Sequence, residues 1–233
     1  MKLLVGIDTE TTTAHPETAE LLQIGAAAFH VDTGVINVIM NALCRPTSNE
    51  IPEDASNIHG IYMEQLIYKP YDQMVAWQLG LMLKDIVSET TPCLVTYNGE
   101  SFDLPILHRY GILTDIPHID VYRIVQRQLW PHGLKLTEVY ESYVGQELDE
   151  AHDAVPDILA TIAILNKFRL ESKMSIEEVV NWLREPIILT ICPFGKHKGI
   201  PFSDIPRGYL RWCKENWGNP SPDLAHTLDF YLQ

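Results

Sequence analysis

The sequence lacks the features of a secreted or membrane-spanning protein. No apolar run approaches the length needed to cross a bilayer. The first apolar run, MKLLVGI, reaches Asp8 and Glu10 too soon to be a signal peptide. Because no CxxC pair occurs, neither a zinc site nor a disulfide framework is indicated. We therefore expect a soluble cytoplasmic protein with reduced thiols and no membrane partner. The cysteines are Cys44, Cys93, Cys192 and Cys213.

Basic residues are scarce, which argues at first against a protein that binds nucleic acid. The chain holds 17 Lys and Arg against 31 Asp and Glu, a formal net charge of -14. The imbalance is uneven, since residues 1 to 189 hold 12 basic and 27 acidic residues, whereas residues 190 to 233 hold five and four. Metal ions bound by carboxylates would reverse the local charge. Net charge therefore does not decide whether the protein binds nucleic acid.

The apolar content of 46% is typical of a folded protein, and its pattern predicts an α/β fold. Three β-rich runs joined by hairpins come first, at residues 2 to 8, 21 to 31 and 34 to 43. Residues 51 to 61 are predicted to form a loop. Alternating helices and strands follow at residues 70 to 87, 93 to 98, 103 to 110, 116 to 120, 121 to 129, 134 to 144 and 153 to 171. This order predicts a mixed sheet flanked by helices.

The composition changes towards the end of the chain. Residues 173 to 189 predict a linker helix, in which Ser175 and Glu178 form a capping box and Pro186 marks the end. Residues 190 to 233 are rich in Pro, Gly, Lys and aromatic residues, and we call them the carboxyl-terminal module. The sequence thus predicts a main domain over residues 1 to 172, followed by the linker helix and the small module.

Two carboxylates, Asp8 and Glu10, end the first apolar run. Residues two apart in a strand point to the same face, so these side chains would lie next to each other while Thr9 faces away. Neighbouring carboxylates repel unless a cation joins them. A solvated strand end would explain such a pair in most proteins. Here the apolar run places the pair at the carboxyl end of a central strand, where ligands gather in open sheets.

Asp103 is the next candidate. It follows Phe102 near the start of a predicted helix, where an acid also serves as a cap. Asn98 and Gly99 close the preceding buried strand with a tight turn, which would bring Asp103 to the strand end that carries the acidic pair. Phe102 would either stack on a base or pack in the core.

His152 and Asp157 complete the candidate site. Helical positions five residues apart lie about 140° apart, so these two would not share a helical face. We expect His152 on the loop before the helix, reaching over the site, and Asp157 in the first turns, pointing inward. An imidazole titrates near neutral pH and suits a general base, although a lone histidine is more often a surface residue. Four carboxylates with one such base suit two Mg²⁺ or Mn²⁺ ions and hydrolysis of a phosphodiester.

The order and local sequences of these residues resemble the DnaQ-like exonucleases of the DEDDh type. The resemblance rests on DTE at residues 8 to 10, NGESFD at residues 98 to 103 and HDAVPD at residues 152 to 157, and it covers about residues 2 to 170. It implies a ribonuclease H-like fold with a mixed sheet of five strands and flanking helices.

The same resemblance implies a mechanism. Asp8, Glu10 and Asp157 would hold one Mg²⁺ ion, Asp8 would bridge to a second ion, and Asp103 would assist directly or through water. Mn²⁺ would be able to replace Mg²⁺. His152 would deprotonate the attacking water. The expected reaction is release of nucleoside 5'-monophosphates from the 3' end of DNA.

The resemblance also implies substrate contacts. The NIHGI segment would lie along the substrate, with His59 at the terminal nucleotide and Asp54 near the terminal sugar. Thr11 would make a backbone contact, and Asn98 and Phe102 would complete the binding residues. Many members have TTGL after the first motif, whereas this chain has TTTAH. The loop over residues 12 to 16 would therefore approach the last base pair or nucleotide in its own way.

The carboxyl-terminal module resembles the module that follows the nuclease domain in one member of this superfamily. Its basic and aromatic residues would hold single-stranded DNA through charge and stacking. A small packing module with an exposed basic face is the alternative. The candidate residues are Lys196, Lys198, Arg207, Arg211 and Trp212.

These features favour a 3'-to-5' exodeoxyribonuclease that acts in DNA repair or proofreading, on single strands or at duplex ends. An exoribonuclease similar to oligoribonuclease or ribonuclease T is the enzymatic alternative, because such enzymes share the same five residues. RNA is then the partner. A third hypothesis is a polymerase accessory subunit that binds nucleic acid through a silent site.

Overall fold

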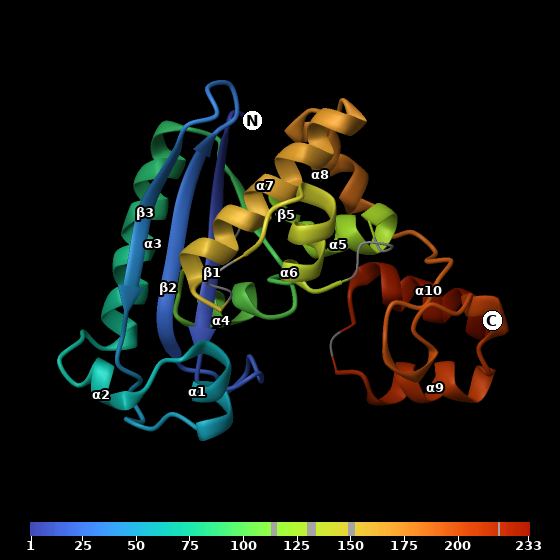
Figure 1. Ribbon diagram of the computed structural model, residues 1–233, viewed down its shortest axis with the longest axis horizontal. Coiled ribbons are helices and arrows are strands. Elements are labelled where there is room, and N and C mark those ends of the chain that lie inside the picture. Colours follow the sequence, from blue (N-terminus) through green and yellow to red (C-terminus); the bar gives the residue numbers. More distant parts are fainter. Residues whose placement is uncertain (113–115, 130–133, 149–151, 219) are drawn as a thin grey trace.

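The computed structural model describes residues 1–112, 116–129, 134–148, 152–218 and 220–233. Its centre is a five-stranded sheet in the order β3-β2-β1-β4-β5. The strands β1 to β3 pair antiparallel, whereas β4 and β5 continue the sheet in parallel with β1 (Figure 1). The mixed sheet predicted from the sequence is therefore confirmed. The strands are β1 Leu3–Thr11, β2 Leu21–His30, β3 Ile36–Leu43, β4 Cys93–Thr96 and β5 His118–Asp120.

Helices cover both faces of the sheet (Figure 1). Along β1, Leu3, Val5 and Ile7 join the apolar cluster that includes α3 and α4, whereas Leu4 joins the cluster that includes α5, α7 and α8. This alternation follows from the period of two in a strand. The sheet is thus the middle layer between two helical layers. The helices are α3 Asp72–Glu89, α4 Asp103–Arg109, α5 Val121–Ile124, α7 Ala154–Ser172 and α8 Ile176–Arg184.

Two glycines allow α7 to lie close to the sheet. A Cβ atom at Gly6 would lie 2.5 Å from Cγ2 of Ile158, and one at Gly25 would lie 2.8 Å from Cβ of Ala154. Gly6 lies on β1 and Gly25 on β2, and both face α7. The amino-terminal turns of α7 therefore lie directly against the carboxyl end of β1.

The prediction of a loop over residues 51 to 61 is wrong. Most of these residues form the short helix α1, Glu53–His59, and a second short helix, α2, Met63–Leu66, follows. Gly60 ends α1 with a left-handed conformation, φ 69°. A helix of seven residues with only Ala55 and Ser56 buried has no apolar stripe long enough to be recognised in the sequence.

Helices form within residues 121 to 129 and 134 to 144, as predicted, but each changes from an α-helix to a π-helical turn along its length. In the described part, α5 and α6, Leu136–Val139, each continue into a π-helical turn, at Val125–Leu129 and Tyr140–Val144. The capping box of α8 forms as predicted, since the Ser175 amide donates to Glu178 over 2.7 Å.

Among the described residues, no helix combines the length and apolar character that crossing a bilayer requires.

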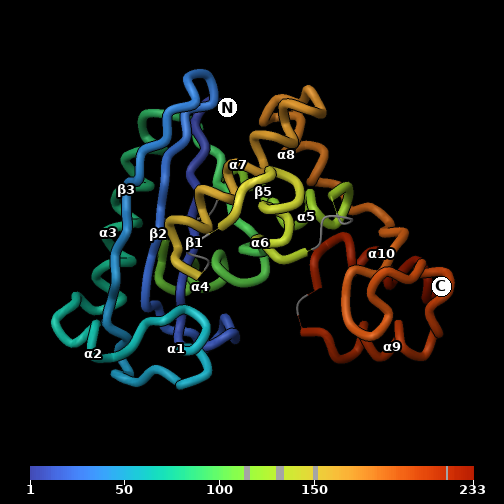
Figure 2. The backbone as a smooth tube through the Cα atoms, viewed as in Figure 1, coloured from blue at the N-terminus to red at the C-terminus, as the bar shows by residue number. Residues whose placement is uncertain are grey.

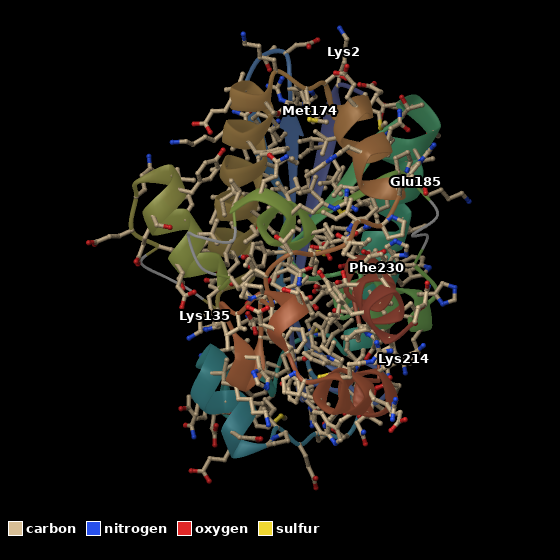
Figure 3. The ribbon with its side chains drawn as sticks, turned by 90° about the vertical axis from the view of Figure 1, so that its right-hand side faces the viewer. Lys2, Lys135, Met174, Glu185, Lys214 and Phe230 are labelled. Atoms are coloured by element: carbon tan, nitrogen blue, oxygen red, sulfur yellow. The ribbon has the colours of Figure 1, made fainter. Side chains whose placement is uncertain are left out.

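The carboxyl-terminal module has its own apolar cluster, which involves residues 187 to 232. It contains α9, Arg207–Asn216, and α10, Pro222–Leu232, and the chain enters it after α8 (Figure 2). Figure 3 shows Lys214 and Phe230 on this module, below Glu185 at the end of α8. The linker helix α8 packs in the apolar cluster of the main domain, whereas the module's cluster begins at Ile187. The predicted division at residues 172 and 189 stays a proposal.

Candidate active site

The carboxyl end of β1 presents Asp8 and Glu10 to the face that α7 covers. Glu10 pairs across the sheet with Gln23 of β2. The Gln23 amide nitrogen donates to Asp153 Oδ1 over 2.9 Å, and Gln23 also accepts from the amide of Ala154 over 3.5 Å. Asp153 is the N-cap of α7, as expected for a helix-terminal acid. Gln23 thus fixes the start of α7 beside Glu10.

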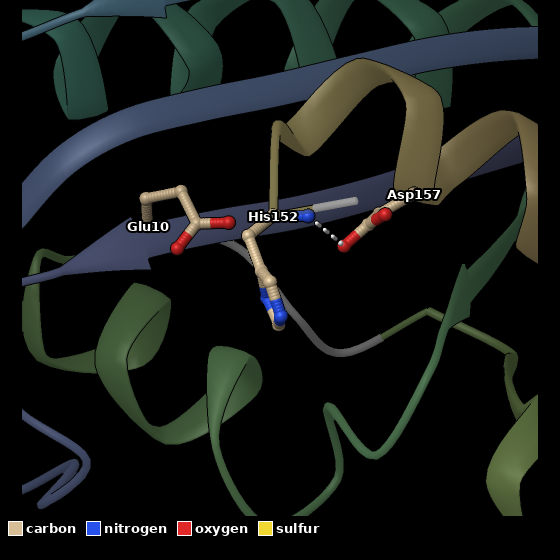
Figure 4. Close-up of side chains that lie close together, drawn as sticks. All are labelled: Glu10, His152 and Asp157. Carbon is tan, nitrogen blue, oxygen red and sulfur yellow. Dashed lines mark hydrogen bonds between the residues drawn. The ribbon is translucent and has the colours of Figure 1, made fainter. Parts of the chain in front are cut away.

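Glu10, His152 and Asp157 converge at this place (Figure 4). Each offers one ligand atom, and these atoms all lie within 4.8 Å of one another. His152 precedes α7 with a left-handed backbone, φ 67°, and Asp157 lies in the first turn, which agrees with the positions predicted from their spacing. The His152 amide donates to Asp157 Oδ2 over 3.3 Å. Among the described residues, this is the group arranged to hold a metal ion.

Asp103 reaches the site from the other face of the sheet. It begins α4 with an exposed fraction of 3%, and Thr9 Oγ1 donates to its Oδ1 over 2.6 Å. Thr9 alternates with Asp8 and Glu10 along β1, so it faces the α4 side. The sequence assigned Thr9 no role beyond facing away. Asp8 and Asp103 lie outside the three-residue group, but the charge of Asp103 acts on both Asp8 and Glu10.

The tight turn predicted at Asn98 forms, with φ 63° at that residue. Asp120, at the end of β5, holds this turn by accepting from the amides of Asn98 over 2.7 Å and Glu100 over 3.0 Å. A Cβ atom at Gly99 would lie 2.5 Å from the Thr96 side chain, so glycine is required. Asp120 was not identified from the sequence, because a single acid after a short strand carries no distinctive pattern.

The carboxylates destabilise one another as anions. Burial, together with the neighbouring acids, raises the pKa of Glu10 to about 8 and holds the pKa of Asp8 well above its usual value. Burial raises the pKa of Asp157 to about 6, against the opposing effect of His152. Burial also raises the pKa of Asp103 to about 6, although the Thr9 hydrogen bond opposes it. A cation among these groups would remove the repulsion.

The buried carboxylate of Asp157 fits a bound cation. Its Oδ1 is buried and has no hydrogen-bond partner among the described residues. An unpaired buried carboxylate oxygen is costly unless a cation or donor satisfies it. Carboxylate oxygens are the ligands that Mg²⁺ prefers, so the residues present fit a hard divalent ion.

A hollow of about 320 Å³ opens beside this cluster, a volume suited to a small ligand. The predicted substrate residues Thr11, Asp54, His59 and Phe102 line it, together with Glu10. Asn98 lines a separate hollow beside Asp120 and Arg123.

His59 lines this hollow with one ring nitrogen engaged. Its Nδ1 accepts from the Ile61 amide over 3.0 Å, and its Nε2 is buried and faces the backbone of Thr11 without a hydrogen bond of good geometry. Burial lowers the pKa of His59, the Thr11 backbone opposes this shift, and His152 adds to it.

The predicted residues of the module are not part of this hollow. Trp212 is 57% exposed and stacks on Tyr209, with ring centroids 6.1 Å apart, while the Lys196 ammonium lies 4.9 Å from the Tyr209 centroid. Arg207 donates to the carbonyl oxygen of Leu232, so it is engaged within the module. Lys198 and Arg211 are exposed.

Known families and proteins resemble this chain over most of its length. A family model described as "Exonuclease" matches residues 5 to 165, and one described as "Putative quorum-sensing-regulated virulence factor" matches residues 182 to 233. The chain is 27% identical over 240 residues to Exodeoxyribonuclease 10 of Escherichia coli K12, covering 97% of both proteins. That relative is exonuclease X, the superfamily member whose module the end of this chain resembles.

Solved structures share the fold. Escherichia coli exonuclease I in complex with a dA16 oligonucleotide matches with a TM-score of 0.59 and 20% identity over 78% of this chain, which spans only 43% of that chain. A 3'-exonuclease described by its recognition of the histone mRNA stem-loop matches with a TM-score of 0.59 and 19% identity, covering 73% of this chain and 82% of that one. At these identities the likeness establishes the ribonuclease H-like fold.

Proposed function

The chain belongs to the exonuclease family, and on this premise we propose that it is a 3'-to-5' exodeoxyribonuclease that releases nucleoside 5'-monophosphates. The observation that carries the proposal is the convergence of Glu10, His152 and Asp157 beside an unpartnered carboxylate oxygen. DNA is favoured as the substrate because the likeness to Exodeoxyribonuclease 10 extends through the module. DNA repair or proofreading in the cytoplasm is the proposed setting.

Asp8, Glu10 and Asp157 would hold the first of two Mg²⁺ ions, with Asp8 shared with the second and Asp103 assisting. Mn²⁺ is the expected substitute, because it shares the preference for oxygen ligands. The raised pKa values of the carboxylates support this assignment, since a cation relieves their repulsion. When bound, such ions polarise the scissile phosphate and stabilise the developing charge on the leaving oxygen.

His152 is the proposed general base. It is exposed, it precedes α7 beside Glu10 and Asp157, and its backbone amide donates to Asp157 Oδ2. In this position the ring would accept a proton from the attacking water and pass it to solvent.

The hollow beside Glu10 would take the 3'-terminal nucleotide. His59 would contact the nucleotide from the wall of this hollow, and Phe102 would offer an aromatic surface to the base. Thr11 would supply backbone contacts, and Asp54 lies on α1 where the terminal sugar would lie. Asn98, in the separate hollow, would contact the next nucleotide.

The module would hold the strand upstream of the 3' end. Exposed Trp212 with Tyr209 and Lys196 forms an aromatic surface beside a cation, which suits stacking of single-stranded bases. Arg211 and Lys198 extend the positive charge. Arg207 is the weakest of the five candidates, because it is already bound to the Leu232 carbonyl.

Cleavage of 3'-labelled DNA and RNA oligonucleotides with Mg²⁺ or EDTA tests the proposal. We expect Mg²⁺-dependent release of mononucleotides from DNA, lost in Asp157→Asn. Asp32→Asn is the matched control, because Asp32 is an exposed acid paired with Lys2. Faster cleavage of RNA would instead favour an exoribonuclease. No metal-dependent release from either substrate would leave a silent binding subunit.

A further inference from the structure

A buried carboxylate joins the module to the rest of the protein. Asp223, at the start of α10, has an exposed fraction of 0%. It accepts from Arg127 over 2.8 Å and 2.7 Å and from Arg123 over 3.4 Å and 3.2 Å. The Ile187 amide of the linker also donates to it over 3.0 Å. Asp223 is therefore fully satisfied by groups outside the module's α9 and α10.

This arrangement keeps Asp223 charged. Burial alone would raise its pKa, but the hydrogen bonds from Arg127 and Arg123 outweigh burial and lower it. Conversely, loss of the carboxylate would leave two buried guanidinium groups, since the side chains of Arg123 and Arg127 are 8% and 0% exposed. Such a loss is more disruptive than the loss of a surface ion pair.

Arg123 also reaches the turn that precedes Asp103. Arg123 Nη1 lies 3.6 Å from Glu100 Oε2, within the turn at residues 98 to 102. Arg123 belongs to the four-residue helix α5, whose N-cap is Asp120, the residue that holds the amides of Asn98 and Glu100. A small hollow lies between this turn and residues 220 to 222 of the module. Two contacts thus connect Asp223 to the turn through α5.

We infer that Asp223 is a positioning residue for the active site: by fixing Arg123 and α5, it sets the turn at residues 98 to 103 and hence the placement of Asp103. The inference rests on the proposed function and deepens it. The module would then support the site through α5 in addition to holding DNA. A purely structural role for Asp223 would affect folding stability but leave the turn and the chemical step unchanged.

The test compares Asp223→Asn with Asp229→Asn in the full chain. Asp229 also lies on α10, but it pairs with Lys214 inside the module, with both side chains more than half exposed. The substrate is a DNA trinucleotide, which leaves few nucleotides to contact the module surface around Trp212. We expect Asp223→Asn to lower kcat at saturating substrate about tenfold or more, as expected for displaced catalytic groups. Asp229→Asn should match the unaltered protein.

Hydrogen exchange gives a readout that needs no activity. In Asp223→Asn, the amides of Asn98 and Glu100 should exchange faster than in Asp229→Asn. Glu100→Gln provides an independent arm, because it weakens the Arg123 contact without disturbing the buried cluster, and it should lower kcat while the melting temperature stays unchanged.

Unchanged exchange at Asn98 and Glu100 in Asp223→Asn would overturn the inference. The inference would also be overturned if Asp223→Asn left kcat on the trinucleotide unchanged and weakened only the binding of long DNA. An unaltered protein that cleaves no substrate would instead reject the proposed function, and the exchange measurement would still decide the role of Asp223.

Discussion

Thr9 links the two faces of β1 at the candidate site. Its hydroxyl donates to the buried Asp103 and favours the ionised carboxylate. Thr9→Val keeps the shape but removes the donor, so the pKa of Asp103 should rise and its affinity for a cation should fall. We expect about tenfold more Mg²⁺ for half-maximal cleavage, which corresponds to one lost hydrogen bond to a charged acceptor. A Mg²⁺ titration of activity measures this, and Thr9→Ser, which retains the hydroxyl, should stay close to the unaltered protein.

The carboxylate cluster predicts how the stability of the metal-free protein changes with pH. The pKa of Glu10 in the folded state, about 8, lies above its ordinary value of 4.5. Between these values the folded protein holds a proton that the unfolded chain has lost, so stability falls as pH rises through this window. Below pH 4.5 the carboxyl group is protonated in both states and the penalty disappears.

Asp8→Asn removes a second carboxyl group with the same penalty, because burial and the charges of Asp103 and Glu10 hold the pKa of Asp8 well above its usual value. In EDTA at pH 8, this variant should be more stable than the unaltered protein by at least about 1 kcal/mol, from one unit of pKa shift. Near pH 4.5 the two should converge. Chemical denaturation at both pH values provides the measurement. Added Mg²⁺ should stabilise the unaltered protein more than the variant, and cleavage by the variant should be lost.

At the scale of elements, the close approach of α7 to the sheet decides where Asp157 and His152 lie. Gly25→Ala would place a Cβ atom 2.8 Å from that of Ala154 and 2.9 Å from Cδ1 of Ile158. We expect the start of α7 to move outward, at a cost of about 1–3 kcal/mol in stability. Cleavage should fall by about a hundredfold, because the displaced groups are those that act on substrate.

Gly80→Ala is the matched control for this change. Gly80 lies within α3, where an added Cβ atom would meet only Cγ1 of Ile112 at 3.9 Å. The free energy of unfolding of this variant should rise by about 0.5–1 kcal/mol, because alanine loses less conformational entropy than glycine when a helix forms. Equal activity losses in the two glycine variants would contradict the role assigned to α7.

The regular elements were largely predictable because their signals are local. Runs of apolar and β-forming residues indicated β1 to β3, and the capping box at Ser175 and Glu178 indicated α8. The helix α1 was missed, since seven residues with two buried side chains leave no period to detect. The π-helical turns after α5 and α6 were also missed, because no residue type marks them.

The candidate site was predictable only in part, because sequence signals are local whereas several of its contacts join distant parts of the chain. Asp8, Glu10, Asp103, His152 and Asp157 carry motifs that the sequence displays, and their chemical roles stay predictions. Thr9, Gln23 and Asp120 act through contacts with residues distant in the chain: Thr9 with Asp103, Gln23 with Asp153, and Asp120 with Asn98. Such contacts depend on how the sheet brings strand ends together, which spacing along the sequence does not reveal.

At the scale of the whole molecule, we expect the negatively charged chain to bind DNA through a few exposed groups. Trp212→Ala should weaken binding of a long single-stranded oligonucleotide in EDTA by about 1–3 kcal/mol, the value for one lost base stack. Trp77→Ala is the matched control, because Trp77 is 64% exposed on α3 and lies outside the proposed DNA path. Equal effects of the two substitutions would argue against the module surface.

Charge on the module has its own signature. Replacing Lys196 and Arg211 with glutamine should reduce the steepness with which salt weakens binding, by about 0.7 in the logarithmic slope for each lost phosphate contact to a single strand. Cleavage of a trinucleotide should stay unchanged, because these side chains do not line the hollow beside Glu10. Binding isotherms at several salt concentrations measure the slope.

The parallel pairing of β1 with β4 and the packing of α7 on β1 also have a consequence during synthesis. The ribosome releases the amino-terminal end first. A nascent chain therefore carries Asp8 and Glu10 long before Asp157 emerges, and Asp223 follows later still. Ribosome-bound chains that stop before residue 152 should show no metal-dependent cleavage. The protein would therefore acquire the ability to cleave DNA only late in its synthesis.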